Sequence, residues 1–200
     1  MPTFTELPFN ARPDLTPYLL HLTKNTKQED EYSALNNLES ILTTGEIWGS
    51  DTDKGFIKGP NEATCFMDVP FAALKYVLTP GNSDPVKPRY EPYGIVITKK
   101  VAHARGCRPV LYLSNEETKA LNIPKDELWR VVRFEVNEGD WISWLHEREW
   151  RCKGDFGLPE GIPAVFVKTT AEAGKLSAKI ARAVANSKPW ACTPLSVIPF

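Results

Sequence analysis

The sequence predicts an α+β fold in which helices flank a mixed, split β-sheet, within a single domain over residues 1–200. The chain of 200 residues is 42% hydrophobic and 24% charged, enough to bury one core without requiring a second. Predicted strands and helices alternate along the chain, and a run of strands comes late in it. No segment recurs with a period of about 20 to 50 residues, which excludes a solenoid.

The first strand and the first helix have clear local signals. Residues 18–24, YLLHLTK, form an apolar run after a lead-in of residues 1–17, which we expect to be irregular, and this run predicts a strand. Residues 33–43 have apolar side chains at helical spacing. Ser33 is the expected N-cap, and Gly45 lies just past the end of the predicted helix.

The segments that follow are rich in glycine and proline. Residues 46–63 predict a loop over the surface. A short strand then precedes a helix over residues 70–78, with Pro70 in its first turn and Asp68 as its cap. Residues 79–92 contain several prolines, which cannot donate backbone hydrogen bonds, so we expect an internal loop there.

Strands and helices alternate in the second half of the chain. The predicted strands are residues 93–100, 108–114, 144–152, 164–168 and 194–200. The predicted helices are residues 100–106, 115–122 and 170–185. Residues 126–136 fit both a helix and an alternating strand, and we favour a helix that ends near Arg133.

Residues 143–155, SWLHEREWRCKGD, concentrate charged and aromatic side chains. Part of this segment alternates as a strand does, so that successive side chains point to opposite faces. The face that we expect to line a cleft carries Glu147, Glu149 and Arg151. The face that we expect to turn toward the core carries His146, Arg148 and Trp150. Arg151 is expected to pair with one carboxylate and to leave the other to a ligand.

Charge and cysteine content exclude several classes of protein. The net charge is -1 at pH 7, which gives no global electrostatic reason to bind nucleic acid or an anionic membrane. The cysteines have no C-x-x-C pair and fit neither a disulfide scaffold nor a zinc site. They are Cys65, Cys107, Cys152 and Cys192. The same cysteine spacing gives no reason to expect a metal ion. Since no signal peptide or long apolar run is present, we expect a cytoplasmic protein with no membrane contact.

Four stretches occur in an order typical of a known family: HLTK with NLESILTTGEIWGS, CFMDVPFAALKYVL, YGIVITKK with GCRPVLYLS, and WLHEREWR. Across roughly residues 18–155 they resemble the AbiGi-type proteins of bacterial abortive infection. More distantly, the H-x-T strand, the N-L-x-x-I-L helix and the late glutamate are similar to the ADP-ribosyltransferase superfamily, with the DarT-type DNA ADP-ribosyltransferases as nearest analogue. The resemblance implies an ADP-ribosyltransferase-like sheet with its first strand near the centre, and a role in phage defence or toxin–antitoxin systems.

The resemblance also implies a chemistry, in which an N-glycosidic bond of NAD or a nucleotide is cleaved and the product is passed to a nucleic acid or protein acceptor. Such a transfer passes through an oxocarbenium-like centre, which a nearby carboxylate stabilises. Glu149, or Glu147 on the same face, fits this role. The resemblance assigns contact with the ribose to His21, and we expect His21 and Glu149 to lie close to one cleft.

The remaining candidates would hold the nucleotide. Thr23 shares a strand face with His21, and the resemblance assigns stacking on nicotinamide to an aromatic ring, for which Tyr93 and Tyr112 are alternatives. Arg151 lies beside the glutamates and completes the set. Neither a G-x-x-x-x-G-K-[ST] nor a G-x-G-x-x-G loop is present, so the phosphates would be held in some other way.

Structural alternatives stay open for the same residues. A histidine on an apolar strand, as at His21, is more often structural than a ligand contact, and residues 147–151 also fit a solvated face with ion pairs. In that case the chain is a non-catalytic, antitoxin-like binding or regulatory module with a degenerate pocket and a cognate toxin or antitoxin. A metal-dependent nuclease is the least favoured alternative, because only EREWR approaches the clustered acids that it needs.

Overall fold

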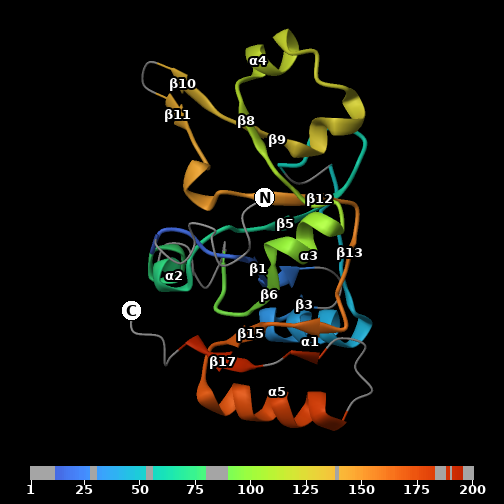
Figure 1. The fold of residues 1–200 in the computed structure, drawn as a ribbon, viewed down its shortest axis with the longest axis vertical. Coiled ribbons are helices and arrows are strands. Elements are labelled where there is room, and N and C mark those ends of the chain that lie inside the picture. The colour runs from blue at the N-terminus through green and yellow to red at the C-terminus, as the bar shows by residue number, and fades with distance from the viewer. Residues whose placement is uncertain are drawn as a thin grey trace. The chain divides into compact units, whose positions relative to one another are not determined.

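The computed structural model describes residues 12–27, 31–52, 56–79, 90–137, 140–182, 188–189 and 191–195. In these residues, helices are combined with parallel and antiparallel strands, so the fold is α+β with mixed sheets, as the sequence predicts (Figure 1). The chain forms two compact units. The first consists of Met1–Glu46, Val69–Lys99 and Leu158–Phe200, and the second of Ile47–Asp68 and Lys100–Gly157. The single domain over residues 1–200 stays a prediction.

The first unit is built around a four-stranded sheet with the order β1-β6-β15-β17. Its strands are β1 (Tyr18–Leu22), β6 (Gly94–Thr98), β15 (Ala164–Val167) and β17 (Cys192–Pro194). β6 is antiparallel to β1 and to β15, whereas β17 is parallel to β15. Ile95, Val96 and Ile97 are all buried, so β6 is covered on both faces and lies inside the sheet.

β1 is an edge strand of this sheet in the described part of the chain, so the prediction that the first strand lies near the centre is wrong. Leu19 and Leu20 are buried, but His21 and Leu22 remain half-exposed. β1 is buried over only part of its length, which fits a strand at the edge of a sheet. β6 is buried over almost all of its length, which fits an inner strand. The two strands approach closely at Gly94, where a Cβ atom would lie 2.6 Å from the carbonyl oxygen of His21.

α1 (Ala34–Thr44) forms with the caps that the sequence predicts. The Ser33 hydroxyl accepts a hydrogen bond from the backbone N–H of Asn36 (3.1 Å), which satisfies one donor of the first turn. Gly45 ends the helix in the left-handed conformation, with a φ of 76°, and its N–H donates to the carbonyl of Ile41 (2.8 Å). Both predictions for this helix are confirmed.

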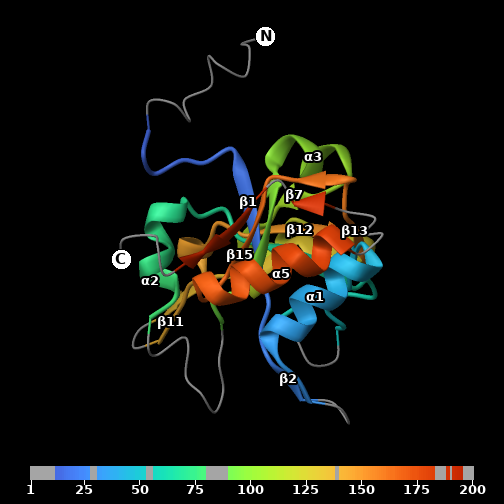
Figure 2. The ribbon, with the colours of Figure 1, turned by 90° about the horizontal axis from the view of Figure 1, so that it is seen from below.

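α5 (Thr170–Arg182) lies along β15 and β17 in both ribbon views (Figures 1 and 2). Ala173 and Leu176 are its buried apolar residues, three positions apart, as expected for one helix face. One hydrophobic core cluster of this unit contains Leu20, Leu74, Val96, Phe166 and Leu195. The predicted helix over 170–185 is confirmed as far as Arg182, and residues 183–185 lie outside the described residues.

The second unit contains a three-stranded antiparallel sheet with the order β5-β12-β7. Its strands are β5 (Ala63–Phe66), β12 (Trp150–Lys153) and β7 (Arg108–Pro109). A parallel pair is formed by β8 (Leu111–Leu113) and β9 (Val131–Arg133), and a hairpin by β10 (Glu135–Asn137) and β11 (Asp140–Ile142). β12 therefore lies between β5 and β7, two strands that come earlier in the chain.

The other elements are short. The remaining strands are β2 (Thr26–Lys27), β3 (Glu31–Tyr32), β4 (Glu46–Ile47), β13 (Phe156–Gly157), β14 (Gly161–Ile162) and β16 (Lys188–Pro189). The remaining α-helices are α2 (Leu74–Val77), α3 (Lys99–Ala104) and α4 (Asn115–Ala120). The 3-10 helices are η3 (Phe71–Ala73), η4 (Lys125–Arg130) and η5 (Leu145–Glu147).

Two helix predictions need correction. Residues 126–136 do not form a helix to Arg133, because η4 ends at Arg130 and β9 follows it. Val131 and Val132, the β-branched residues that begin β9, are buried, and β9 pairs with the parallel strand β8. Both features favour the extended conformation. Asp68 is not a helix cap, since η3 begins after Pro70 without a side-chain cap.

Parts of three further predictions lie outside the described residues. These parts are residues 1–11 of the lead-in, residues 80–89 of the proline-rich loop and residues 196–200 of the last predicted strand. The strand predicted over 108–114 is present as β7 and β8, which are separated at Val110.

Candidate functional site

The side chains of Arg151 and Glu149 form a two-point ion pair in the second unit. Nε of Arg151 donates to Oε1 of Glu149 (2.8 Å), and Nη2 donates to Oε2 (3.2 Å). Nη1 of Arg151 donates to the carbonyl oxygen of Trp129 (2.8 Å). Arg151 is only 2% exposed, so this guanidinium depends on protein groups for its hydrogen bonds. The predicted pairing of Arg151 with a carboxylate is present, and the carboxylate is that of Glu149.

Electrostatics in this cluster favour the ionised pair. Burial is the largest single influence and lowers the pKa of Arg151, but the charge and hydrogen bonds of Glu149, together with the interaction with Cys65, raise the pKa overall. Cys65 lies opposite Arg151 on β5. Burial, followed by the charge of Glu149, raises the pKa of the Cys65 thiol well above its ordinary value, so this thiol stays protonated.

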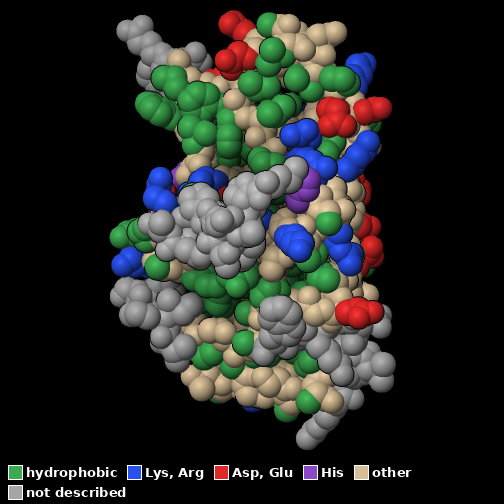
Figure 3. Space-filling model, in the orientation of Figure 1, with side chains coloured by type: hydrophobic (Ala, Val, Ile, Leu, Met, Phe, Trp, Pro, Cys, Tyr) green, Lys and Arg blue, Asp and Glu red, His purple; other side chains and the backbone are tan. Residues whose placement is uncertain are grey.

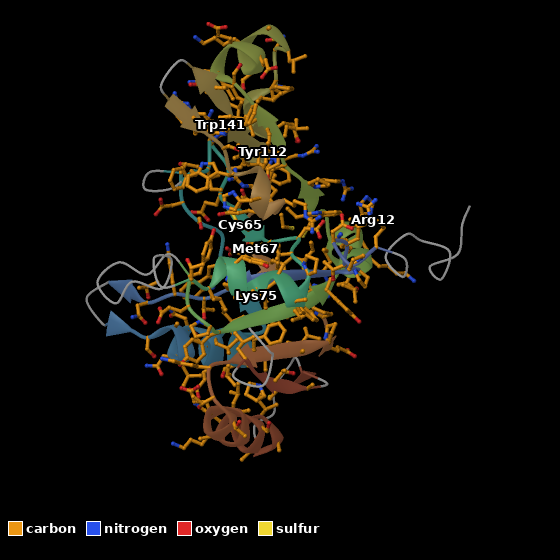
Figure 4. The ribbon with its side chains drawn as sticks, turned by 90° about the vertical axis from the view of Figure 1, so that its left-hand side faces the viewer. Arg12, Cys65, Met67, Lys75, Tyr112 and Trp141 are labelled. Carbon is orange, nitrogen blue, oxygen red and sulfur yellow. The ribbon has the colours of Figure 1, made fainter. Side chains whose placement is uncertain are left out.

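Tyr112 on β8 fixes the backbone on both sides of η5. Its hydroxyl accepts a hydrogen bond from the backbone N–H of Glu149 (2.9 Å) and donates to the carbonyl oxygen of Trp144 (3.3 Å). Burial raises the pKa of Tyr112 to about 12, and the charges of Glu149 and Glu147 act in the same direction. The hydroxyl is therefore a neutral anchor for the segment that carries both glutamates. Figure 4 marks Tyr112 together with Cys65.

The segment before β12 is not a strand, so the predicted alternation over residues 144–152 is wrong for its first part. η5 is followed by Arg148, whose φ of 44° is in the left-handed region. Nε of Arg148 donates to the carbonyl oxygen of Asp68 (2.8 Å), and the Asp68 N–H donates to the carbonyl oxygen of Glu147 (3.2 Å). These contacts with a distant segment support a turn that non-glycine residues adopt rarely.

This turn changes where the two glutamates lie. Glu147 ends η5 and Glu149 precedes β12, so they do not share a strand face. Their side chains are 13% and 11% exposed, so both are largely covered. Nε2 of His146 lies 4.0 Å from Oε1 of Glu147, whereas Glu149 is held by Arg151. Both oxygens of the Glu149 carboxylate thus accept hydrogen bonds from one buried guanidinium.

The candidates of the first unit are tied into its sheet. Thr23 is buried, and its hydroxyl donates to the carbonyl oxygen of Ala34 (2.8 Å) at the start of α1. The Tyr93 hydroxyl donates to Oε1 of Glu172 in α5 (2.9 Å). Burial, followed by this hydrogen bond, raises the pKa of Tyr93 above its ordinary value. Thr23 and Tyr93 thus use their polar groups to join strands to helices.

The structure brings four of the sequence candidates together in the second unit, and these are Glu147, Glu149, Arg151 and Tyr112. The other three belong to the first unit: His21 on β1, and Thr23 and Tyr93 close to it. The expectation that His21 and Glu149 share a cleft involves both units and stays a prediction.

Sequence reasoning missed three contributors to the glutamate cluster. These are the carbonyl oxygen of Trp129, the thiol of Cys65 and the backbone of Asp68. Two of the three act through backbone atoms, which leave no trace in residue type. One signal for the Cys65 contact was available in the sequence. Residues 64–66 (TCF) and 150–152 (WRC) were both predicted to be extended, as two paired strands are.

Exposed apolar side chains add a second feature to this unit. Trp141 is 70% exposed and lies opposite Val136 in the hairpin of β10 and β11. Phe56 is 76% exposed and lies 5.9 Å from the ring of Trp144. Figure 3 shows hydrophobic side chains gathered at the upper left, over β10 and β11, and Figure 4 marks Trp141. Apolar surface of this kind is typical of interaction sites.

Searches of family models and of curated proteins gave no match to this chain. Two solved structures are similar to it, and both are of DarT from Thermus sp. 2.9, one in complex with NAD+ and one with carba-NAD+. Each is 14% identical in sequence, with a TM-score of 0.46, over 90% of this chain and 96% of the DarT chain.

Two classes of site are not found in the described part of the chain. No group of three or more His, Cys, Asp or Glu side chains there is arranged to hold a metal ion. Among the same residues, no helix combines the length and the apolar character needed to cross a membrane.

Proposed function

We propose that this chain is an ADP-ribosyltransferase-like enzyme that cleaves the N-glycosidic bond between nicotinamide and ribose in NAD. The observation that carries the proposal is the way in which Glu149 is held. Both oxygens of its carboxylate accept hydrogen bonds from Arg151, and its backbone N–H donates to the hydroxyl of Tyr112. The more distant resemblance to ADP-ribosyltransferases, through the H-x-T strand, the N-L-x-x-I-L helix and the late glutamate, supports it. A carboxylate held in this way needs little reorganisation to meet a developing positive charge.

In the proposed reaction, the bond between the ribose anomeric carbon and the nicotinamide nitrogen breaks. The electron pair leaves with nicotinamide, and positive charge develops on the ribose, where Glu149 stabilises it. An acceptor atom of a nucleic acid or protein then bonds to the same carbon and gives up its proton to solvent water. Where no acceptor is present, water takes its place and the reaction is hydrolysis. Glu147 is the second carboxylate that we propose for this site.

Arg151 acts in this scheme as a positioning residue. Because it is almost fully buried, with hydrogen bonds to Glu149 and to Trp129, it orients the carboxylate of Glu149. We propose that His21 contacts the ribose and that Thr23 belongs to the same nucleotide site. For the ring that stacks on nicotinamide, we propose Tyr93 or Tyr112, whose hydroxyls are both already hydrogen-bonded within the protein.

The biological setting that we propose is phage defence in the bacterial cytoplasm, by abortive infection or as one member of a toxin–antitoxin pair. Support comes from the resemblance to AbiGi-type proteins. Val136 and Trp141 favour a macromolecular acceptor or cognate partner, because exposed apolar side chains paired on a hairpin provide contact area for a second molecule.

A second candidate function is a non-catalytic binding or regulatory module, antitoxin-like in character. The specific observation in its favour is that both oxygens of Glu149 accept hydrogen bonds from Arg151. A carboxylate that neutralises a buried guanidinium has a structural purpose without any ligand.

Incubation of the purified chain with NAD tests the proposal against this alternative. The release of nicotinamide is measured by chromatography, and NAD binding by the shift in melting temperature. The enzyme proposal predicts steady release of nicotinamide with time and a melting temperature that rises with NAD concentration. If no nicotinamide is released, and the melting temperature stays constant with NAD at concentrations up to the millimolar range, the binding module is the better account.

A further inference from the structure

Cys107 directly precedes β7 in the second unit, and Cys152 lies on the neighbouring strand β12. β12 and β7 are antiparallel, with Arg151 opposite Arg108. The same register, continued by one residue, sets Cys152 opposite Cys107. The two thiols interact with each other, and Sγ of Cys152 also donates to the carbonyl oxygen of Arg105 (3.3 Å). Cys107 is 0% exposed and Cys152 is 5% exposed. Two cysteines that are distant in the sequence thus form a contact pair in the fold.

The surroundings divide the two thiols into different roles. The contact with Cys107 lowers the pKa of Cys152 against the effect of burial, and the positive charges of Arg108 and Arg105 act in the same direction. The same contact raises the pKa of Cys107. Cys152 is the thiol whose thiolate is favoured by both arginines, which makes it the attacking thiol of the pair. This asymmetry is what a nucleophilic cysteine and its resolving partner require.

We propose that Cys107 and Cys152 form a reversible cross-strand disulfide when the protein meets a small-molecule disulfide such as oxidised glutathione. Directly opposed residues on antiparallel strands have Cα atoms about 4.5 to 5.5 Å apart. A disulfide accepts Cα separations of about 4.4 to 6.8 Å, so the bond needs little movement of the backbone. The proposal is independent of the function proposed for Glu149.

The reaction proceeds by two thiol–disulfide exchanges. The thiolate of Cys152 attacks one sulfur of oxidised glutathione, forms a mixed disulfide and releases one glutathione thiolate. The sulfur of Cys107 then attacks the Cys152 sulfur, displaces the second glutathione, and passes its proton to the departing thiolate. The protein dithiol is oxidised by two electrons, and one glutathione disulfide is reduced to two thiols.

Access to the pair is controlled by β7. This strand has two residues and lies at the edge of the sheet order β5-β12-β7, so it is the part of the sheet that opens most readily. Because both thiols are buried, exchange follows local opening of β7. Once formed, the disulfide joins β7 to β12 at the residue next to Arg151.

The test uses the full chain under native conditions. The reduced protein is incubated with oxidised glutathione, the remaining thiols are alkylated, and the digested peptides are analysed by mass spectrometry. We expect the peptide of Cys107 to be linked to that of Cys152, with Cys65 and Cys192 alkylated. The link should disappear on treatment with dithiothreitol, and the oxidised protein should melt at least about 5 °C higher than the reduced protein.

Matched variants separate the two roles. In Cys107→Ser, the mixed disulfide of Cys152 with glutathione should persist, since no resolving thiol is present. Cys152→Ser should gain no glutathione at Cys107. Cys192→Ser should keep the internal link and the shift in melting temperature. The proposal is overturned if wild-type protein shows no link between Cys107 and Cys152, if another cysteine takes either place, or if the link forms only in denaturant.

Discussion

The two units use a glutamate in different ways. In the second unit, Glu149 neutralises Arg151, a guanidinium that is almost completely buried. In the first unit, Glu172 accepts hydrogen bonds from the neutral hydroxyl of Tyr93 and from the N–H and hydroxyl of Thr169, at the exposed start of α5. Removal of a partner leaves an uncompensated buried charge in the second unit only. The difference predicts where the chain is most sensitive to substitution.

Arg151→Met should have the largest effect on stability. It leaves the carboxylate of Glu149 without its counter-charge and the carbonyl of Trp129 without its donor, so we expect a loss of about 3 to 5 kcal/mol in the free energy of unfolding. Urea denaturation followed by circular dichroism measures the loss. Arg12→Met is the matched control, because the side chains of Arg12 and Asp14 are 59% and 51% exposed in their ion pair. Equal losses in the two variants would contradict a special cost of the buried charge.

Tyr112→Phe should have the next largest effect. The change removes the acceptor for the Glu149 N–H and the donor to the carbonyl of Trp144 while it keeps the ring, and we expect a loss of about 1 to 3 kcal/mol. Tyr76→Phe, at a tyrosine that is 73% exposed, should leave stability unchanged. The same denaturation experiment serves both variants. A Tyr112→Phe protein as stable as Tyr76→Phe would show that the hydroxyl does not hold the turn at η5.

Tyr93→Phe should have a smaller effect, about 0.5 to 1.5 kcal/mol, because it removes one hydrogen bond between neutral and charged partners at a partly exposed position. The effect should also depend on pH. Burial acts to raise the pKa of Glu172, but the hydrogen bonds from Tyr93 and Thr169 outweigh it and lower the pKa below 4.5.

A lowered pKa in the folded protein means that the Glu172 contacts stabilise it above the ordinary pKa of 4.5, and that this contribution is lost as the pH falls through the folded value. The difference between wild type and Tyr93→Phe should therefore narrow as the pH is lowered from about 6 to about 3. Unfolding free energies measured at several pH values check this. A difference that stays constant over that interval would mean that Tyr93 does not act through the Glu172 carboxylate.

Local signals allowed much of the fold to be predicted, and long-range backbone contacts account for what could not. The helix at α1 was predictable because Ser33 and Gly45 satisfy its ends through neighbouring atoms. The turn at Arg148 was not, because it depends on the carbonyl of Asp68, which comes from a distant segment. For the same reason, the pairing of Arg151 with a nearby carboxylate could be predicted, whereas its hydrogen bond to Trp129 could not.

If Glu149 serves catalysis as well as the neutralisation of Arg151, Glu149→Gln should slow the release of nicotinamide from NAD without unfolding the protein. Release from NAD is measured at saturating NAD and at a temperature at which circular dichroism shows the variant to be folded. Glu39→Gln is the control, since it breaks an ion pair with Lys179 in the first unit. We predict that Glu149→Gln releases nicotinamide at least about 100-fold more slowly than wild type, while NAD still raises its melting temperature, and that Glu39→Gln retains the wild-type rate. A folded Glu149→Gln protein that releases nicotinamide at the wild-type rate, with only its melting temperature lowered, would contradict the account and leave Glu149 a structural partner of Arg151.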